Sequence, residues 1–281
     1  MPSTKPTIAQ RQDDELPSYG ELSKLYVLPS YLSACPLKPY RPFPTVLHAC
    51  RRLSHLNAIT FQEGSEENDI YRIETRRGFN KIEPLGSRAG ILLRNGPGKK
   101  DQVLAAAGEK SPWARYCKDG TTSSVFFLPP FEFGTNSRAM VMEAMKMTAT
   151  EDGSDTFTFF VEVEPIWEWK RQKFQWVQQQ IRKDVFSLFR CGKADKTEYG
   201  TDLEAMPTAA SSASSSPVNG EMVATLVFHR GFASGSREFT LTMHGSLGQG
   251  ILGERCTLSV VVTAVWIWSL QRRRRGETVI R

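Results

Sequence analysis

The chain has 281 residues, of which 40% are hydrophobic and 10% aromatic, enough apolar material for a folded core and too much for a wholly disordered chain. Its formal net charge is +6, but four of the positive charges lie in one run, Arg272 to Arg275. Because a nucleic-acid-binding face needs basic residues spread over a surface, we expect no nucleic-acid partner.

The cysteines and histidines argue against a disulfide framework and against a metal site. The cysteines are odd in number and widely scattered, which favours reduced thiols in a cytosolic or nuclear compartment, and we expect a cytoplasmic protein. They are Cys35, Cys50, Cys117, Cys191 and Cys256. The histidines are not spaced as zinc ligands, so we expect no metal and no cofactor. Met1 to Lys5 leads into no apolar stretch, so we expect no signal peptide.

Residues 1–66 are rich in proline and lack periodic apolar runs. Proline removes a backbone donor and favours extended conformations in its neighbour. We therefore predict a disordered N-terminal arm over 1–66, followed by a folded domain over 67–272 and a basic C-terminal tail over 273–281.

Within the predicted domain, short alternating runs separated by turn residues indicate many strands. The clearest is Thr156–Glu164, where Phe157, Phe159 and Val161 share one face. Other expected strands are Ile70–Thr75, Ile91–Leu93, Val103–Ala107, Ser123–Leu128, the stretch around Phe174 and Trp176, Val185–Phe189, Met222–Phe228 and Phe239–Met243. Ala139–Met147 suits a helix or a strand, and the serine-rich stretch 208–219 reads as a flexible insertion.

The segment Cys256–Leu270 is apolar nearly all round and does not alternate. A helix of this kind is buried in protein or in lipid. Its run of about 15 residues falls short of the ~20 that span a bilayer, which favours a core helix over a tail anchor. A strand is a third alternative, because Val260 to Val262 are β-branched.

Four short motifs in chain order point to a known family. They are Lys173-Phe174-Gln175-Trp176, Phe186-Ser187-Leu188-Phe189-Arg190, Glu221-Met222-Val223-Ala224, and Leu252-Gly253-Glu254-Arg255 leading into the apolar segment. This order resembles the fungal tubby C-terminal-domain-like proteins, which are similar to plant LURP-one-related proteins and phospholipid scramblases. The resemblance implies a closed antiparallel β-barrel around a central hydrophobic C-terminal helix, a mainly β fold. A closed barrel also leaves no open sheet edge.

The same resemblance implies a non-enzymatic domain that binds anionic phospholipid headgroups peripherally at a cytoplasmic membrane surface. Arg272, Arg273, Arg274 and Arg275 are candidate lipid contacts, and a charge complement to the helix dipole is the alternative. The basic pairs Arg76-Arg77, Lys99-Lys100, Lys170-Arg171 and Arg182-Lys183 are further candidates, with solvated turns as the alternative. A tail-anchored or lipid-scrambling membrane protein is an alternative function.

A Leu-Pro-Ser-Tyr string occurs twice in the predicted arm. It resembles the proline-tyrosine motifs that WW domains read in extended conformation. A scaffold that recruits WW-domain proteins such as ubiquitin ligases is therefore another alternative. Its candidate contacts are Leu16, Pro17, Tyr19, Leu28, Pro29 and Tyr31.

Gly248 to Gly253 matches the pattern G-x-G-x-x-G. Too little chain follows it to complete a dinucleotide-binding unit, so we expect a glycine-rich turn that leads into the helix. We find no nucleophile elbow, phosphate loop or catalytic carboxylate pair, and we name no catalytic residue.

Overall fold

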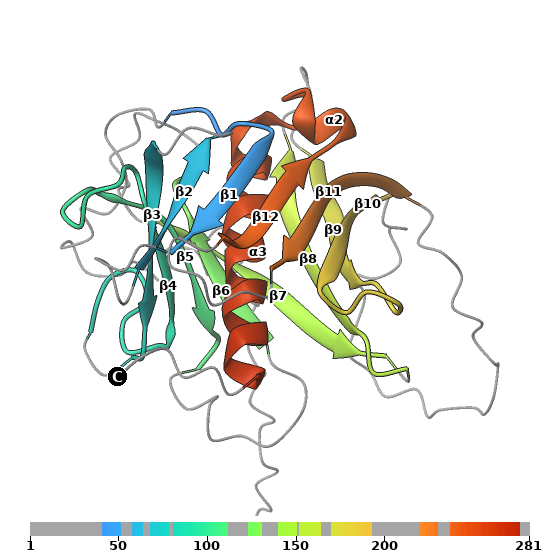
Figure 1. Ribbon diagram of the computed structural model, residues 1–281, viewed down its shortest axis with the longest axis horizontal. Helices are drawn as coiled ribbons and strands as arrows, with labels where there is room; N and C mark the ends of the chain where they lie inside the picture. The colour runs from blue at the N-terminus through green and yellow to red at the C-terminus, as the bar shows by residue number, and fades with distance from the viewer. Residues whose placement is uncertain are drawn as a thin grey trace, which may run out of the picture. The chain divides into compact units, whose positions relative to one another are not determined.

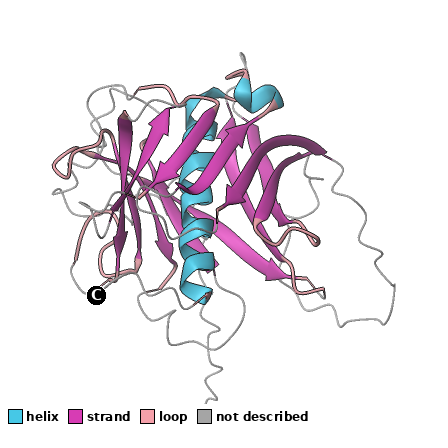
Figure 2. Ribbon diagram, viewed as in Figure 1, coloured by secondary structure: helices cyan, strands magenta, loops and turns pink. Residues whose placement is uncertain are grey.

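The computed structural model describes residues 41–51, 58–63, 68–78, 81–111, 123–130, 140–150, 152–163, 170–192, 220–229 and 237–275. These residues form a closed antiparallel barrel of twelve strands with a long helix inside it (Figures 1 and 2). The predicted fold class, a barrel around a C-terminal helix, is confirmed. The Leu-Pro-Ser-Tyr strings, the stretch 208–219 and residues 276–281 lie outside the described residues.

Each strand pairs with its neighbour in the chain, and β1 pairs with β12 to close the barrel. The strands are β1 (Val46–Cys50), β2 (Ala58–Glu63), β3 (Asp69–Arg76), β4 (Gly90–Arg94), β5 (Val103–Glu109), β6 (Ser123–Leu128), β7 (Val141–Ala149), β8 (Asp155–Val163), β9 (Lys170–Gln178), β10 (Val185–Cys191), β11 (Gly220–Phe228) and β12 (Arg237–Met243). The helices are α2 (Gly245–Gly248) and α3 (Gly253–Arg274).

The barrel interior is filled by one face of each strand and by α3. In β8, Phe157 and Phe159 are fully buried, whereas Thr158 and Phe160, which alternate with them, are partly exposed. This alternation arises because successive side chains of a strand point to opposite faces. The inward side chains pack with those of the helix in one continuous apolar core.

Helix α3 is buried on every side over its central turns. All residues from Leu258 to Ser269 are buried, and the helix contacts strands from around the barrel, among them β4, β8 and β11. The segment is apolar on all sides because strands surround it on all sides. Among the described residues, no helix combines the length and the apolar character that crossing a membrane requires.

The barrel begins earlier in the chain than predicted. Strands β1 and β2 lie within the stretch 1–66 that we assigned to the arm, so the boundary at residue 66 is a wrong prediction for residues 46–50 and 58–63. These strands are short, and β1 finds its partner β12 almost two hundred residues away, at Leu47 and Leu241 for example. Local periodicity does not report a pairing of that kind. The ambiguous stretch Ala139–Met147 contributes strand β7.

A glycine-rich turn connects the barrel wall to α3, as predicted. Gly250 and Gly253 adopt φ angles of 74° and 79°, in the left-handed region that favours glycine. Glu221 of β11 holds α2 in place, because its carboxylate accepts hydrogen bonds from the Ser246 N–H at 2.7 Å and hydroxyl at 2.8 Å. The chain is thereby directed from β12 into the barrel.

Candidate functional site

The two ends of the barrel differ in charge. We call the end at which α3 finishes the exit rim and the opposite end the α2 rim. Among the described residues of the exit rim and its connecting turns, basic side chains outnumber acidic ones. The basic ones are Arg51, Arg76, Arg77, Lys81, Arg88, Lys110, Arg182, Lys183, Arg237, Arg272, Arg273, Arg274 and Arg275, and the acidic ones are Glu74, Glu83, Glu109, Asp152, Asp155, Asp184 and Glu238.

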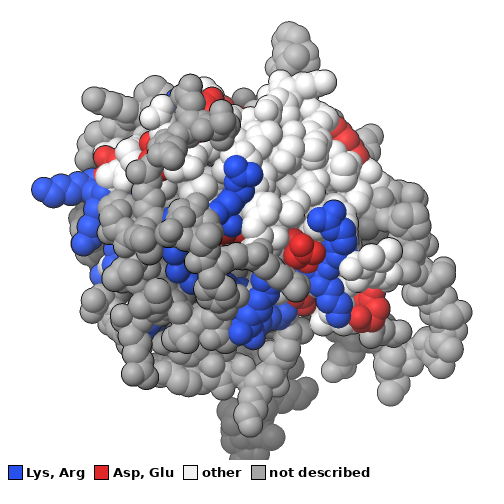
Figure 3. Space-filling view, viewed as in Figure 1, with Lys and Arg blue, Asp and Glu red and all other residues white. Residues whose placement is uncertain are grey.

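At the α2 rim the two signs nearly balance among the described residues. The basic side chains there are Arg41, Arg94, Lys99, Lys100, Arg171, Arg190 and Arg255, and the acidic ones are Glu63, Asp69, Asp101, Glu143, Glu162, Glu221 and Glu254. In Figure 3, blue side chains lie around the lower end of α3, and blue and red side chains lie together near the β9–β10 turn. The surface over the upper parts of β11 and β12 carries little charge in the same view.

The arginines at the end of α3 contact several strands of the barrel. Arg273 Nη1 lies 2.8 Å from Glu109 Oε1 of β5, and the Arg274 guanidinium pairs with the Asp155 carboxylate of β8. Arg272 Nη1 lies 3.9 Å from Glu238 Oε1 of β12. These contacts hold the last turn of α3 against the barrel wall, and the carboxylates neutralise part of the positive charge of the arginines.

The same arginines also stack on aromatic rings. The Arg273 guanidinium carbon lies 4.6 Å from the ring centroid of Trp266, and that of Arg272 lies 5.5 Å from the ring of Trp268. Arg275 lies over Phe228 at 5.9 Å and is exposed. Cation–π contacts of this kind leave the charge available to solvent at the outer edge. Of the four predicted lipid contacts, Arg273, Arg274 and Arg275 are exposed, whereas Arg272 is mostly buried.

Two polar side chains connect the end of α3 to the turn between β9 and β10. Asp155 accepts hydrogen bonds from Arg274 and from Gln271 Nε2, the latter at 2.7 Å. Gln178, which is buried, accepts a bond from the Asp155 N–H at 3.0 Å and donates to the Lys183 carbonyl at 2.6 Å. The Asp184 carbonyl accepts a bond from the Phe228 N–H at 2.8 Å. The turn therefore lies beside the helix end in a defined position.

The tip of that turn carries an exposed isoleucine between polar neighbours. Ile181 is 98% exposed, the highest value among the exposed large hydrophobic residues of the described chain. Arg182 and Lys183 follow it directly and are exposed as well. The sequence analysis named this basic pair but missed Ile181. The available signal was one apolar residue in the otherwise polar run from Gln178 to Asp184.

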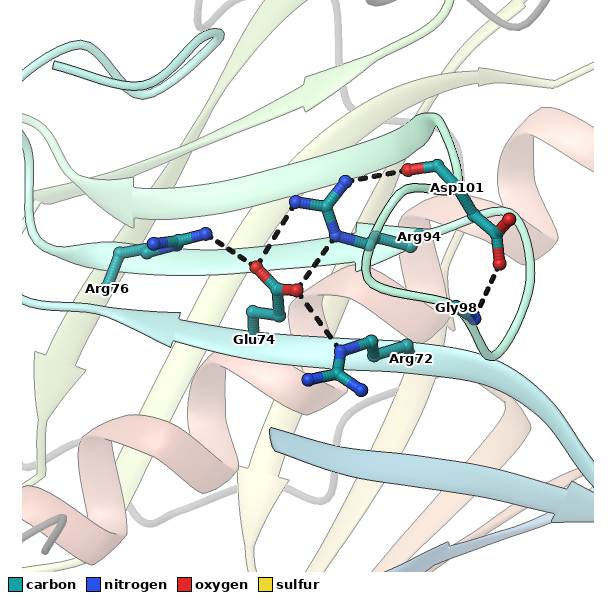
Figure 4. A network of polar contacts seen from close by, with 6 residues as sticks. All are labelled: Arg72, Glu74, Arg76, Arg94, Gly98 and Asp101. Atoms are coloured by element: carbon teal, nitrogen blue, oxygen red, sulfur yellow. Dashed lines mark hydrogen bonds and ion pairs between the residues drawn. The ribbon is translucent and has the colours of Figure 1, made fainter. Parts of the chain in front are cut away.

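A network of polar contacts lies on the outer wall of β3 and β4 (Figure 4). Glu74 receives a bidentate contact from Arg94, with Nε at 3.0 Å and Nη2 at 3.2 Å from the carboxylate oxygens. Arg76 Nη2 approaches the same carboxylate at 2.6 Å and Arg72 Nε at 3.1 Å. Three guanidinium groups thus share one carboxylate, which leaves an excess of positive charge on this wall.

Glu74 stays ionised in this setting. Burial raises its pKa, but the hydrogen bond and charge of Arg94 and those of Arg76 outweigh burial, and the pKa lies below the ordinary value. Arg94 is also fixed from the other side, because its Nη1 donates to the Asp101 carbonyl at 2.6 Å. Its position at the end of β4 is therefore rigid.

The remaining predicted basic pairs are dispersed. Arg76-Arg77 ends β3 at the exit rim, whereas Lys99-Lys100 lies in the β4–β5 turn at the α2 rim. Lys170-Arg171 begins β9 at the α2 rim, where Arg171 pairs with Glu143 at 3.1 Å. The fold brings only the first pair and Arg182-Lys183 to the same rim as the end of α3.

The histidine, carboxylate and cysteine side chains of the described residues do not gather into a metal site. No group of three or more His, Cys, Asp or Glu is arranged there to hold a metal ion. Cys256 on α3 is fully buried, and burial raises the pKa of its thiol well above the ordinary value, so it is a poor nucleophile.

Comparisons of the chain with family models, with curated proteins and with solved structures found no match. The resemblance to tubby-like proteins therefore stays a prediction from short motifs. The exit rim and the network around Glu74 are the sites that the fold itself assembles.

Proposed function

We propose that this protein is a non-enzymatic, tubby-like barrel domain that binds anionic phospholipid headgroups peripherally at a cytoplasmic membrane surface, with the exit rim toward the lipid. The single observation that carries the proposal is the difference in charge between the two ends of the barrel. Each basic residue near an anionic bilayer contributes about 1 kcal/mol to binding. A rim in which basic side chains predominate is therefore attracted to such a surface and oriented by it.

The exposed members of the rim are the lipid contacts in this proposal. Arg182, Lys183, Arg237 and Arg275 are exposed, and no ion pair joins their side chains to an acidic residue within the described part of the chain. Arg272 is mostly buried, and Arg273 and Arg274 pair with carboxylates, so their first role is to hold the helix end. In this proposal, lipid binding therefore depends mainly on Arg182, Lys183, Arg237 and Arg275, and less on the other three arginines of the run.

Flotation with vesicles tests the proposal. We expect the full chain to float at low salt with phosphatidylcholine vesicles that also contain phosphatidylserine or a phosphoinositide, and to remain unbound with phosphatidylcholine alone. Reversing two charges in R182E/K183E lowers binding by at least about tenfold, because each basic residue contributes about 1 kcal/mol. Binding also weakens as salt rises, since charges are screened beyond ~10 Å at 0.1 M.

The matched control is K99E/K100E, which makes the same change in an exposed turn at the α2 rim. We expect it to bind within about twofold of the unmodified chain, because those charges lie at the far end of the barrel. Failure of the unmodified chain to float at low salt overturns the proposal. Equal losses in the two double variants overturn the assignment to the exit rim.

A further inference from the structure

We propose that Ile181 inserts into the bilayer and that the β9–β10 turn is the part of the protein that penetrates the lipid surface. This inference rests on the proposed function, which assigns the exit rim to anionic lipid, and adds an apolar contact that charge alone does not supply. The occupant of this surface is an anionic phospholipid bilayer, because Arg182 and Lys183 next to Ile181 complement its headgroups.

The exposure of Ile181 is the first step of the argument. At 98% exposure the side chain makes almost no contact with the rest of the protein, so nothing in the fold requires an apolar residue there. Single exposed apolar residues are common on protein surfaces. This one differs because it occupies a turn tip at the rim where basic side chains predominate.

The second step is that the turn is held firmly. The Gln179 N–H donates to the Val185 carbonyl at 2.9 Å, and the Val185 N–H donates to the Arg182 carbonyl at 2.8 Å. The Gln178 side chain connects the same turn to Asp155, and through it to Arg274 at the end of α3. A turn fixed in this way loses little conformational entropy when it enters the headgroup region.

The third step concerns the charges beside the tip. Asp152 in the neighbouring β7–β8 turn is hydrogen-bonded to the Thr150 and Ser154 side chains and to Gln180 Nε2, and these bonds hold the pKa of its carboxyl far below the ordinary value. These bonds fix the Asp152 carboxylate in place but leave it ionised, so the attraction to anionic headgroups comes from Arg182 and Lys183 against this negative charge. In the bound state, Arg182 extends its guanidinium group and Lys183 its ammonium group to the headgroup level, while Ile181 reaches the acyl boundary. Amphipathic side chains adopt this arrangement at interfaces.

A pair of substitutions separates insertion from electrostatic attraction. We expect I181S to bind anionic vesicles about tenfold more weakly than the unmodified chain, since burial of an isoleucine side chain contributes at least about 1.5 kcal/mol. The ratio of vesicle affinities between the unmodified chain and I181S stays the same at raised salt, because salt does not screen an apolar contact. The matched control is I251S, at an exposed isoleucine of the α2 rim, which binds like the unmodified chain.

Fluorescence provides an independent readout. I181W gains a blue-shifted emission on addition of anionic vesicles and is quenched by lipids with brominated acyl chains, whereas I251W changes in neither respect. If the unmodified chain floats but I181S binds equally well and I181W stays unshifted, the insertion is overturned and the proposed function stands. If the unmodified chain does not float, both the insertion of Ile181 and the proposed lipid binding are overturned. Unchanged melting temperatures of the variants show that folding is not the cause.

Discussion

At the scale of single residues, polar side chains that connect distant strands decide how the exit rim is built. Asp155 joins β8 to the end of α3, and Gln178 joins β9 to its own turn. Neither residue belongs to a recognisable motif. Their role arises because the barrel brings the beginning of β8, the end of β9 and the end of α3 to one place.

Glu74 is the residue for which the contacts make a prediction about pH. Because its pKa is lower in the folded chain than the ordinary value of 4.5, ionised Glu74 stabilises the fold above that value. The contribution is lost as pH falls through the lowered pKa. We expect E74Q to reduce the free energy of unfolding at pH 7 by about 2 kcal/mol, the range for hydrogen bonds to charged groups.

Urea unfolding of E74Q and of the unmodified chain at neutral and acidic pH checks this expectation. We expect the difference in their free energies of unfolding to become smaller in acid. The control E63Q removes a carboxylate from an exposed pair with Arg41 and costs no more than about 1 kcal/mol at any pH. A difference for E74Q that stays constant from pH 7 into acid contradicts the assignment.

At the scale of elements, the helix and the wall meet through packing and through one buried hydrogen bond. Trp176 Nε1 of β9 donates to Thr263 Oγ1 of α3 at 3.1 Å, and both residues are buried. The hydroxyl in turn donates to the backbone of its own helix, at the Ser259 carbonyl at 2.8 Å or the Val260 carbonyl at 3.1 Å. This bond sets the rotation of α3 relative to β9, which apolar packing alone does not specify.

We expect T263V to destabilise the protein by about 1–3 kcal/mol, because a buried indole N–H is left without its acceptor while the shape of the side chain is kept. Chemical denaturation measures the change. T257V is the control. It removes a threonine hydroxyl six residues earlier in α3, whose hydrogen bond within the described chain goes to the Gly253 carbonyl, and we expect it to change the free energy of unfolding by no more than about 0.5 kcal/mol. Equal costs for the two variants refute the role of the Trp176 bond.

At the scale of the whole molecule, the barrel and its helix form one cooperative unit. The core includes side chains from all twelve strands and from α3. Without the other, neither the barrel nor the helix could bury its apolar surface away from water. Closure by β1 and β12 removes the open edges that an incomplete sheet leaves.

A charge within α3 therefore has a global effect. We expect I267D to unfold the chain, because Ile267 is fully buried and an unpaired carboxylate there costs several kcal/mol, an amount comparable with the stability of a whole domain. Loss of near-ultraviolet circular dichroism and of cooperative melting report the outcome. I251D, the same change at an isoleucine that is 61% exposed, leaves both signals intact. A folded I267D with unchanged melting rules out the enclosed helix.

The sequence by itself determined most of the strands and a mainly β fold, and the closed barrel around a helix was what the resemblance to tubby-like proteins implied. Alternation at Phe157, Phe159 and Val161 identifies a strand, because that pattern follows from local geometry. The apolar segment indicated a helix buried in protein or in lipid, with a strand as an alternative, and the structure places it as a helix inside the barrel. The tertiary structure alone decided the inclusion of β1 and β2 and the place of Ile181 beside the end of α3. The physical reason is that strand partners and neighbouring turns are set by long-range pairing around a closed barrel, which leaves no periodic trace in the chain.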